Sequence, residues 1–331
     1  MPEFLDERSA SKVRHVTALR HRLEIALVLG TERLARLLGR RTARRLGRAL
    51  GTAWYLVMSE QRRVAASNLQ LAFPELSAAH RATLARNSFR HFGELVLDLL
   101  VFSHYSGPQI RDMAIVEGAD HLRRAHAKGQ GVLVFSAHFS HWELVALHQG
   151  FSGLPMDLVV RPMDNPRLER YLMRLRSRWG NRVVYKRRAV RGILTALRER
   201  RSVGMVIDQN YRGTNPFFVD FFGRAAATTP TLGMLAVRTG APVVPVFCWP
   251  EKDGRYRIVY LPEVTVESTG DRAADAFRLT ARCTEIIEQQ IRTRPELWSW
   301  MHQRWKTRPL LPRPAKMPAS PAFRYRRRAE G

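Results

Sequence analysis

The stretch of sequence that decides the fold is Val132-Leu-Val-Phe-Ser-Ala-His-Phe-Ser-His-Trp-Glu143. Its first four residues form a continuous apolar run, which is typical of a strand buried on both faces of a parallel sheet. The polar residues that follow, and the apolar segment after Glu143, indicate a strand-to-helix turn. Within one helix His138 and Glu143 would point about 140° apart, because each residue turns about 100°. We therefore expect His138 in the turn and Glu143 in the first turn of the helix, where the two side chains can meet.

This pair of residue types suits general base chemistry. A carboxylate bound to one imidazole nitrogen fixes the tautomer and leaves the other nitrogen as a base, and N–H groups at the helix start can hold a developing anion. Two simpler interpretations stay open: His138 is a polar surface residue, or Ser140-His-Trp-Glu143 is a capping box in which Glu143 satisfies backbone donors. A zinc site made of His138, His141 and Glu143 would lack the HExxH spacing, so no metal is predicted.

Outward from this stretch, short apolar runs alternate with helical segments from about residue 111. Strands are expected at 132–135, 158–160, 203–207, 243–247 and 255–261, and helices at 165–178, 190–200, 229–239 and 271–292. This alternation predicts an α/β fold, with a central mixed sheet flanked by helices. Residues 12–105 have apolar residues at helical spacing and predict a preceding helical region, which Pro74 breaks and in which Ser77 caps the next helix.

The predicted organisation has three parts: a helical, membrane-associating region over residues 1–110, an α/β domain over 111–305 and a tail over 306–331. The tail holds eight basic residues, one acidic residue and five prolines, which is typical of an extended or disordered segment.

The charge of the whole chain indicates a polyanionic partner. Its 331 residues include 55 Lys and Arg against 29 Asp and Glu, a net charge of +26. Candidate partners are nucleic acid, an anionic membrane, a phosphorylated lipid or an acidic protein. No zinc-finger, RRM or KH signature is present, so a nucleic-acid-binding protein is the remote alternative. The two cysteines exclude a disulfide scaffold and fit a reducing compartment.

A basic amphipathic segment lies near the N-terminus. Seven arginines and no acidic residue occur between Arg33 and Arg48, interleaved with leucines and followed by Trp54 and Tyr55. The pattern predicts either a helix that lies in a membrane interface or a surface helix that packs its leucines on the protein with its arginines in solvent. The sequence shows no apolar run of about 18–20 residues and no signal peptide, so we expect peripheral attachment rather than a spanning helix.

The turn sequence resembles the late acyltransferases of lipid A biosynthesis (the lauroyl and myristoyl transferase family), within the lysophospholipid acyltransferase superfamily. The signature His-x4-Glu is found here in Ala137-His-Phe-Ser-His-Trp-Glu143, with Ala137 for the usual Gly and His141 for the usual Asn. The resemblance covers about residues 60 to 309. The other matching blocks, in order, are Asn68-Leu, Phe73-Pro-Glu75, Val160-Arg-Pro-Met-Asp-Asn-Pro166, Asp208-Gln-Asn210, Phe221-Phe-Gly223, Ala227-Thr-Thr229, Gly240–Pro245 and Pro295–Lys306.

The resemblance implies transfer of a fatty acyl chain from acyl-ACP or acyl-CoA to a hydroxyl of a lipid A precursor or related glycolipid, without a cofactor. It implies that His138 is the general base and that Glu143 orients it. Substrate binding or oxyanion stabilisation would fall to Arg161, Arg176, Asp208 and Gln209. The simpler alternatives are solvated surface arginines and an aspartate that caps a helix or braces a loop.

The same resemblance implies attachment to the cytoplasmic face of the bacterial inner membrane, peripheral or N-terminally anchored. The implied partners are acyl carrier protein or a CoA thioester, a glycolipid and the anionic membrane surface. A phosphatidylinositol mannoside or a lysophospholipid is the alternative acceptor. Trp298, Trp300 and Trp305 either line an acyl pocket or pack the last helix on the core.

Overall fold

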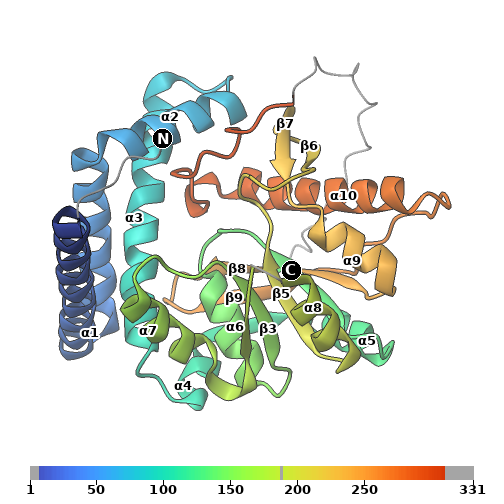
Figure 1. Cartoon of the computed structure of the whole chain (residues 1–331), viewed down its shortest axis with the longest axis horizontal. Coiled ribbons are helices and arrows are strands. Elements are labelled where there is room, and N and C mark those ends of the chain that lie inside the picture. The colour runs from blue at the N-terminus through green and yellow to red at the C-terminus, as the bar shows by residue number, and fades with distance from the viewer. Residues whose placement is uncertain (1–6, 187–188, 310–331) are drawn as a thin grey trace, which may run out of the picture.

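The computed structural model describes residues 7–186 and 189–309, with side chains from Thr17 onward (Figure 1). Its centre is a sheet of seven strands in the order β1-β9-β8-β2-β5-β3-β4. Strand β9 is antiparallel to β8 and parallel to β1, whereas the other neighbouring strands are parallel to each other. The predicted mixed sheet is therefore confirmed. The bounds are β1 (Ala114–Glu117), β2 (Val132–Ser136), β3 (Met156–Val160), β4 (Arg182–Tyr185), β5 (Ser202–Val206), β8 (Val243–Pro250) and β9 (Tyr256–Tyr260).

Helices cover both faces of the sheet, and the side chains of β2 alternate between the two layers. Val132 and Val134 pack in the core formed with α4 (Gly107–Asp112), α5 (Ala119–Ala127), α6 (Trp142–Phe151) and α7 (Pro166–Arg176). Leu133 and Phe135 pack in the other core, formed with α8 (Ala189–Arg198), α9 (Thr231–Thr239) and α10 (Arg272–Thr293). Burial on both faces explains why β2 is a continuous apolar run and not an alternating one.

Two 3₁₀ turns and a hairpin complete the α/β part. They are η1 (Arg178–Gly180), η2 (Pro295–Leu297) and the hairpin of β6 (Phe217–Phe221) with β7 (Arg224–Thr228). The sequence pattern did not predict β1, β4 or this hairpin. Strand β7 begins Arg-Ala-Ala-Ala, and alanine is not enriched in strands, so its pairing depends on β6 rather than on local propensity.

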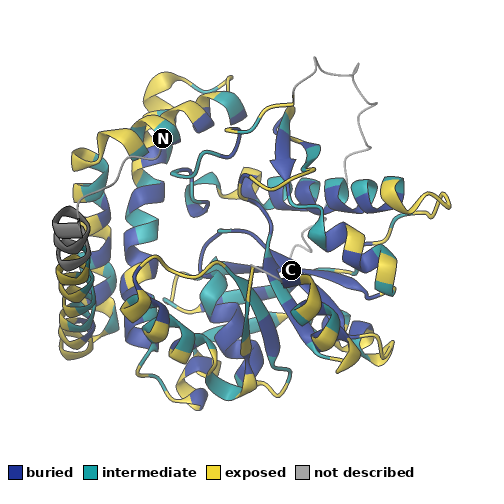
Figure 2. Cartoon of the chain, viewed as in Figure 1, coloured by how far each residue is buried: buried dark blue, intermediate teal, exposed yellow. Residues whose placement is uncertain are grey.

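The helical region that precedes the α/β part is made of α1 (Glu7–Val57), α2 (Ser59–Ala72) and α3 (Ala78–Phe102). The predicted cap of α3 is confirmed, because the Ser77 side chain accepts a hydrogen bond from the His80 N–H at 3.2 Å. Helix α1 bends at Gly39, whose φ of 74° lies in the region that favours glycine. Figures 1 and 2 show α3 between α1 and the rest of the molecule, with buried residues on its inner side.

The orientation of α1 contradicts the interpretation in which its leucines pack on the protein and its arginines face solvent. Arg40 and Arg44 turn inward and form ion pairs with Asp98 and Glu94 of α3. The more exposed Arg48 also pairs with Glu94. A set of leucines instead lies on the surface of α1, and Leu37 is 83% exposed. The expectation that a surface helix packs its leucines inward is therefore wrong, because acidic residues about 50 positions away compete for the arginines. This leucine row consists of Leu19, Leu23, Leu27, Leu34, Leu37 and Leu38.

Within residues 7–186 and 189–309, none of the helices has the length and apolar character that crossing a membrane requires.

Candidate active site

The turn after β2 has the predicted arrangement. His138 lies between the end of β2 at Ser136 and the start of α6 at Trp142, and Glu143 is the second residue of α6. The capping-box interpretation is wrong, because the N-cap of α6 is His141, whose ring nitrogen accepts from the Leu144 N–H. The backbone N–H of Ser140 instead donates to Leu297 of η2 at 2.8 Å.

The imidazole of His138 is held by Asp208. Ser136 and Val206 are paired in the parallel ladder of β2 and β5, so the residues two positions beyond each strand meet at the same edge of the sheet. The distance from His138 Nδ1 to Asp208 Oδ1 is 2.9 Å, and the His138 backbone N–H donates to Asp208 Oδ2 at 2.9 Å. The indole N–H of Trp298 also donates to Asp208 Oδ2, at 2.6 Å.

These contacts keep the buried carboxylate ionised. Burial by itself raises the pKa of Asp208, but the His138 imidazole and the hydrogen bonds from His138 and Trp298 outweigh it and lower the pKa to about 2. The ionised Asp208 accepts a hydrogen bond from the N–H at Nδ1 of His138. This leaves Nε2 of His138 as the nitrogen that can accept a proton. Asp208, which the sequence analysis placed among the candidate substrate-binding residues, is thus hydrogen-bonded to the imidazole of His138.

The expected hydrogen bond between Glu143 and His138 is not found among the contacts of the described residues. Arg176 at the end of α7 takes the Glu143 carboxylate instead, with its Nε 3.2 and 3.0 Å from the two oxygens and its Nη2 bound to Oε1. Burial raises the pKa of Glu143, but the Arg176 guanidinium overcomes this and keeps it below its usual value. The physical reason for the difference is that Nδ1 of His138 carries a single N–H, which Asp208 already accepts.

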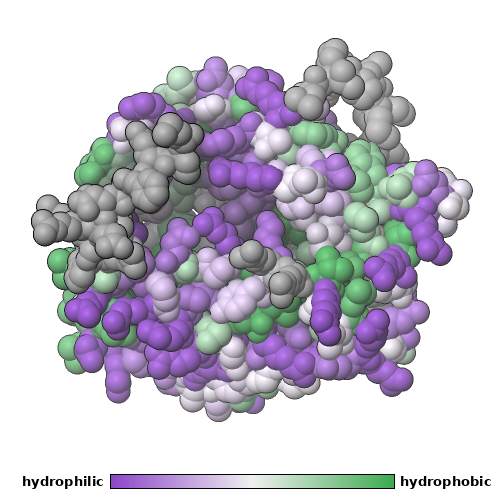
Figure 3. All heavy atoms as spheres, in the orientation of Figure 1, coloured by the Kyte–Doolittle hydropathy of each residue, from purple (hydrophilic) through white to green (hydrophobic). Residues whose placement is uncertain are grey.

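A cavity of about 490 Å³ contains His138, Glu143, Arg176 and Gln209 in its lining. The amide nitrogen of Gln209 lies 3.2 Å from His138 Nε2, so a hydroxyl group that uses this nitrogen must displace the amide. The rest of the lining is largely apolar and includes Val134, Ala146, Met156, Leu158, Val206 and Val246. Figure 3, in the orientation of Figure 1, shows a hollow near the centre of the molecule with hydrophilic residues around it.

Two cationic side chains also line this cavity. Arg161 follows β3, is 76% exposed and pairs with Asp164 at 3.0 Å. Lys186 follows β4, and its ammonium lies 5.3 Å from the Tyr211 ring centroid. Burial, together with the charge of Arg161, lowers the pKa of Lys186. The sequence interpretation missed Lys186, because the strand that it follows, β4, was not predicted from the sequence.

The C-terminal segment around residues 297–307 holds the site in place. Phe139 pairs with Trp298 in an antiparallel bridge, and the Ser299 N–H donates to the His138 carbonyl at 3.1 Å. Arg304 is buried and donates to the carbonyls of Gln209 and Ala227 at 3.3 and 2.7 Å. Burial lowers the pKa of Arg304 to about 10.

The three tryptophans of this region pack rather than line the His138 cavity. Trp298 and Trp300 are 1% and 0% exposed, and their ring centroids are 4.6 Å apart. Trp305 is 9% exposed and lies against Phe221 at 5.7 Å. The sequence did not indicate that Trp298 would also bind Asp208, because 90 residues separate the two positions.

A histidine bound to an ionised aspartate lies at the carboxyl ends of two parallel strands of an α/β fold, beside a largely apolar cavity. Such an arrangement can take a proton from a hydroxyl group, and the cavity suits a substrate with apolar parts. Residues 11–307 match the family described as bacterial lipid A biosynthesis acyltransferase, and the chain belongs to this family.

Three relatives illustrate the similarity. The chain is 31% identical over 267 residues to the lipid A biosynthesis palmitoleoyltransferase of Escherichia coli K12, a match that covers 80% of this chain and 85% of the relative. It is 31% identical over 270 residues to the lipid A biosynthesis lauroyltransferase of the same organism, with the same coverage. A lipid A biosynthesis acyltransferase of Haemophilus influenzae is 28% identical over 278 residues, again covering 80% and 85%.

Proposed function

We propose that this protein transfers a fatty acyl chain from a thioester donor, acyl-ACP or acyl-CoA, to a hydroxyl of a lipid A precursor, with His138 as the general base. The observation that carries the proposal is the contact of His138 Nδ1 with the buried carboxylate of Asp208, at the wall of an apolar cavity. The family and the names of the relatives support the acceptor class.

The reaction follows from the tautomer that Asp208 selects. Nε2 of His138 takes the proton of the acceptor hydroxyl, and the oxygen attacks the thioester carbonyl carbon. A C–O bond forms and the carbonyl oxygen becomes an oxyanion. When this intermediate collapses, the C–S bond breaks and the imidazolium returns its proton to the leaving thiolate. The thioester supplies the leaving group, so the proposal needs no cofactor.

We assign Glu143 and Arg176 to the oxyanion. The fork of two hydrogen bonds to Glu143 holds the guanidinium of Arg176 in one orientation, with 17% of its side chain exposed. Arg176 Nη1 forms no hydrogen bond with the residues that the structure describes, so its two N–H groups can donate to a ligand in the cavity. Glu143 thus acts through Arg176, whereas the resemblance had implied that it acts through His138.

The donor enters, in this proposal, past Arg161 and Lys186. Both acyl-ACP and acyl-CoA carry phosphate next to the thioester-bearing arm, and two cations at the cavity wall suit that group. The apolar lining then receives the acyl chain. A phosphatidylinositol mannoside or a lysophospholipid remains the alternative acceptor to be tested.

The surface that we propose to contact the membrane is the leucine row of α1. The row lies near the His138 cavity, because Asn165, close to the cavity residues Arg161 and Met163, donates to Glu24 of α1 at 2.8 Å. A helix with exposed leucines and basic neighbours suits the interfacial layer of an anionic membrane. We place this surface on the cytoplasmic face of the inner membrane.

Acyl transfer by purified protein tests the roles. With acyl-ACP or acyl-CoA and a lipid A precursor, we expect His138→Ala to lower kcat by about 10²–10⁴-fold, the usual contribution of a general base. Asp208→Asn should lower kcat by a similar factor, since an amide can present its NH₂ group to Nδ1 and select the wrong tautomer. Glu143→Gln and Arg176→Lys should each lower kcat by about 10²-fold through the lost oxyanion donor.

The matched controls are His80→Ala and Asp120→Asn, two exposed side chains outside the cavity, which should leave the rate unchanged. A folded His138→Ala variant that keeps the wild-type rate contradicts the base assignment. Equal rates with a lysophospholipid and with the lipid A precursor contradict the acceptor assignment.

A further inference from the structure

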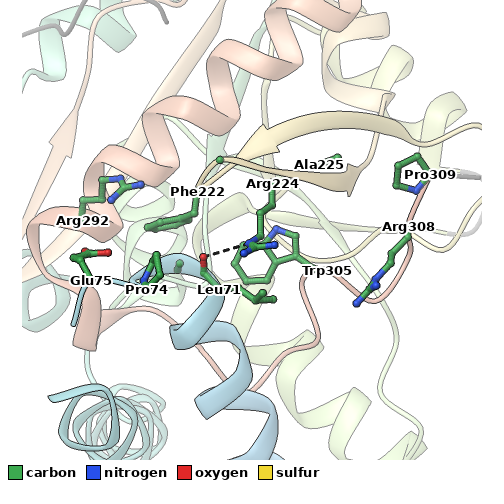
Figure 4. Close-up of a pocket in the computed structure, with 12 residues that line it drawn as sticks. Leu71, Pro74, Glu75, Phe222, Arg224, Ala225, Arg292, Trp305, Arg308 and Pro309 are labelled. Atoms are coloured by element: carbon green, nitrogen blue, oxygen red, sulfur yellow. Dashed lines mark hydrogen bonds between the residues drawn. The ribbon is translucent and has the colours of Figure 1, made fainter. Parts of the chain in front are cut away.

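A second cavity, of about 790 Å³, lies between the end of α2, the β6–β7 turn, the end of α10 and the C-terminal segment (Figure 4). None of its lining residues lines the His138 cavity. Its lining combines three arginines, Arg224, Arg292 and Arg308, with the aromatic rings of Phe222 and Trp305. The acyl transfer described above makes no use of these groups.

The charges in this cavity are unevenly compensated. Arg292 is neutralised, because its Nε and Nη2 lie 2.8 and 2.7 Å from Glu288 Oε1, and its guanidinium stacks on Phe222 at 4.4 Å. Among the residues that the structure describes, Arg224 has a single weak contact, from Nε to the Leu71 carbonyl at 3.4 Å. Arg308 forms no hydrogen bond or ion pair with any residue that the structure describes. Two cations therefore remain available, against the single carboxylate of Glu75 in the lining.

Trp305 provides an independent observation. Its side chain is 9% exposed, and its indole Nε1 has no acceptor among the described residues. A buried N–H group without an acceptor is costly, and native proteins usually satisfy such groups with a partner, water or a ligand. The indole donor and the two guanidinium groups line the same cavity, and together they suit a ligand with several acceptor oxygens and negative charge.

We propose that this cavity binds the phosphate group of an anionic lipid and, on the function proposed above, a phosphate of the acceptor glycolipid. Guanidinium forks match the oxygens of phosphate, and the indole N–H adds one further donor. Leu71, Pro74 and Phe222 give the same cavity an apolar wall, which a free phosphate ion does not use. This wall favours a phosphate that is attached to a lipid.

The two cavities are close enough to receive one acceptor molecule. Strand β7 leads from Ala225 in the second cavity towards Thr229 in the His138 cavity, four residues or about 13 Å along an extended chain. The C-terminal segment makes the same connection, because Thr307, next to Arg308, accepts from Asn210 at 3.0 Å. A glycolipid whose reacting hydroxyl and phosphate lie that far apart would occupy both cavities.

Calorimetric titration of the full chain tests the site without turnover. The probes are octyl phosphate, inorganic phosphate and octyl glucoside. We expect octyl phosphate to bind, inorganic phosphate to bind more weakly and octyl glucoside not to bind. The double substitution Arg224→Gln with Arg308→Gln should weaken octyl phosphate at least about tenfold, because hydrogen bonds to charged groups contribute that much. Trp305→Phe should weaken it by a smaller factor.

Two further variants sharpen the titration. Glu75→Gln removes the opposing charge and should tighten octyl phosphate binding, a change opposite in sign to the arginine substitutions. Arg238→Gln, an exposed arginine on α9 outside both cavities, should leave it unchanged. Absence of octyl phosphate binding, or binding that the double substitution does not weaken, overturns the proposal.

Kinetics assign the phosphate to the acceptor. The double substitution should raise KM for the phosphorylated acceptor about tenfold with little change in kcat, and should not change KM for its dephosphorylated form. A rise in KM for acyl-ACP alone would place the arginines on the acidic donor protein and overturn the proposal. Because the titration needs no turnover, failure of acyl transfer in the wild type and failure of phosphate binding are separate results.

Discussion

The buried carboxylate of Asp208 binds three hydrogen-bond donors from two separate parts of the chain. It is 2% exposed and accepts hydrogen bonds from the ring and the backbone of His138 and from Trp298. Three donors on one carboxylate compensate the cost of burying its charge. They also connect the ends of β2 and β5 and the C-terminal segment at the turn that contains His138. The orientation of His138 therefore depends on the stability of this cluster.

Acid should weaken this cluster in a defined pH window. The folded-state pKa of Asp208 is about 2, below the usual value of roughly 3.9, so its ionised form stabilises the folded state by about 2–3 kcal/mol. This contribution is complete above pH of about 5 and is lost as the pH falls through about 4 towards 2. We expect Asp208→Asn to lower the free energy of unfolding by about 2 kcal/mol at pH 6 and by much less near pH 2.5, measured by urea denaturation.

The control for this measurement is Asp112→Asn, an exposed aspartate whose side chain is 67% accessible. It should change the free energy of unfolding by less than about 0.5 kcal/mol at every pH. A difference between wild type and Asp208→Asn that stays constant down to pH 2.5 would show that the charge of Asp208 does not stabilise the fold.

At the scale of elements, the contact between α1 and α3 is decided by small residues. Gly47 and Gly51 on α1 face Gly93 on α3, and a Cβ on Gly93 would lie 2.2 Å from the Gly47 carbonyl oxygen. The backbones approach this closely because no side chain separates them. The same approach brings Arg40 and Arg44 to Asp98 and Glu94, which bury their charges between the two helices. Charge reversal of Arg40 and Arg44 would therefore destabilise the fold, so these two residues do not suit a test of membrane binding.

Gly93→Ala should force the two helices apart. We expect a loss of about 1–3 kcal/mol in the free energy of unfolding, the usual cost of overpacking, measured by thermal or urea denaturation. The matched control is Gly30→Ala on α1, where an added Cβ meets no atom within 4 Å. This control should be neutral or stabilising by up to about 1 kcal/mol, since alanine favours a helix interior over glycine. Equal effects at the two positions would contradict the close backbone contact.

For the whole molecule, the membrane surface that we propose combines the leucine row of α1 with exposed arginines of the same helix. Arg36, Arg41 and Arg45 are exposed on the same helix as that row, whereas Arg40 and Arg44 are not available. Electrostatic attraction to anionic lipid and burial of leucines should contribute separately, because salt screens only the first.

Vesicle sedimentation separates the two contributions. The triple substitution of Arg36, Arg41 and Arg45 by Glu should weaken binding to anionic vesicles by roughly 100-fold or more, at about 1 kcal/mol per basic residue. Substitution of Leu23, Leu27 and Leu37 by Asn should weaken binding to anionic and neutral vesicles alike.

The matched control for this experiment replaces three exposed arginines of α8 and α9 by Glu, namely Arg191, Arg198 and Arg238. It changes the net charge by the same amount and should weaken binding far less. Equal losses from the two arginine sets would show that net charge, and not the α1 surface, attracts the membrane.

The elements that depend on local pattern could be predicted from the sequence. Strand β2 and helices α7 to α10 follow from continuous apolar runs and helical spacing, so the α/β class and the place of His138 in its turn were predicted. The order of motifs also indicated the family that the comparison confirms. The short strands β1 and β4 and the alanine-rich β7 could not be predicted, because neighbouring strands hold them in place.

Only the tertiary structure decided the partners of the charged residues. The register between β2 and β5 brings His138 to Asp208, and the position of α7 brings Arg176 to Glu143. The sequence spacing had instead suggested a contact between His138 and Glu143. In the same way, ion pairs with Asp98 and Glu94 hold Arg40 and Arg44 of α1 inward, and the leucine row stays on the surface. Local periodicity tells which residues share a face of an element, but an ion pair depends on distances in space between residues far apart in the chain.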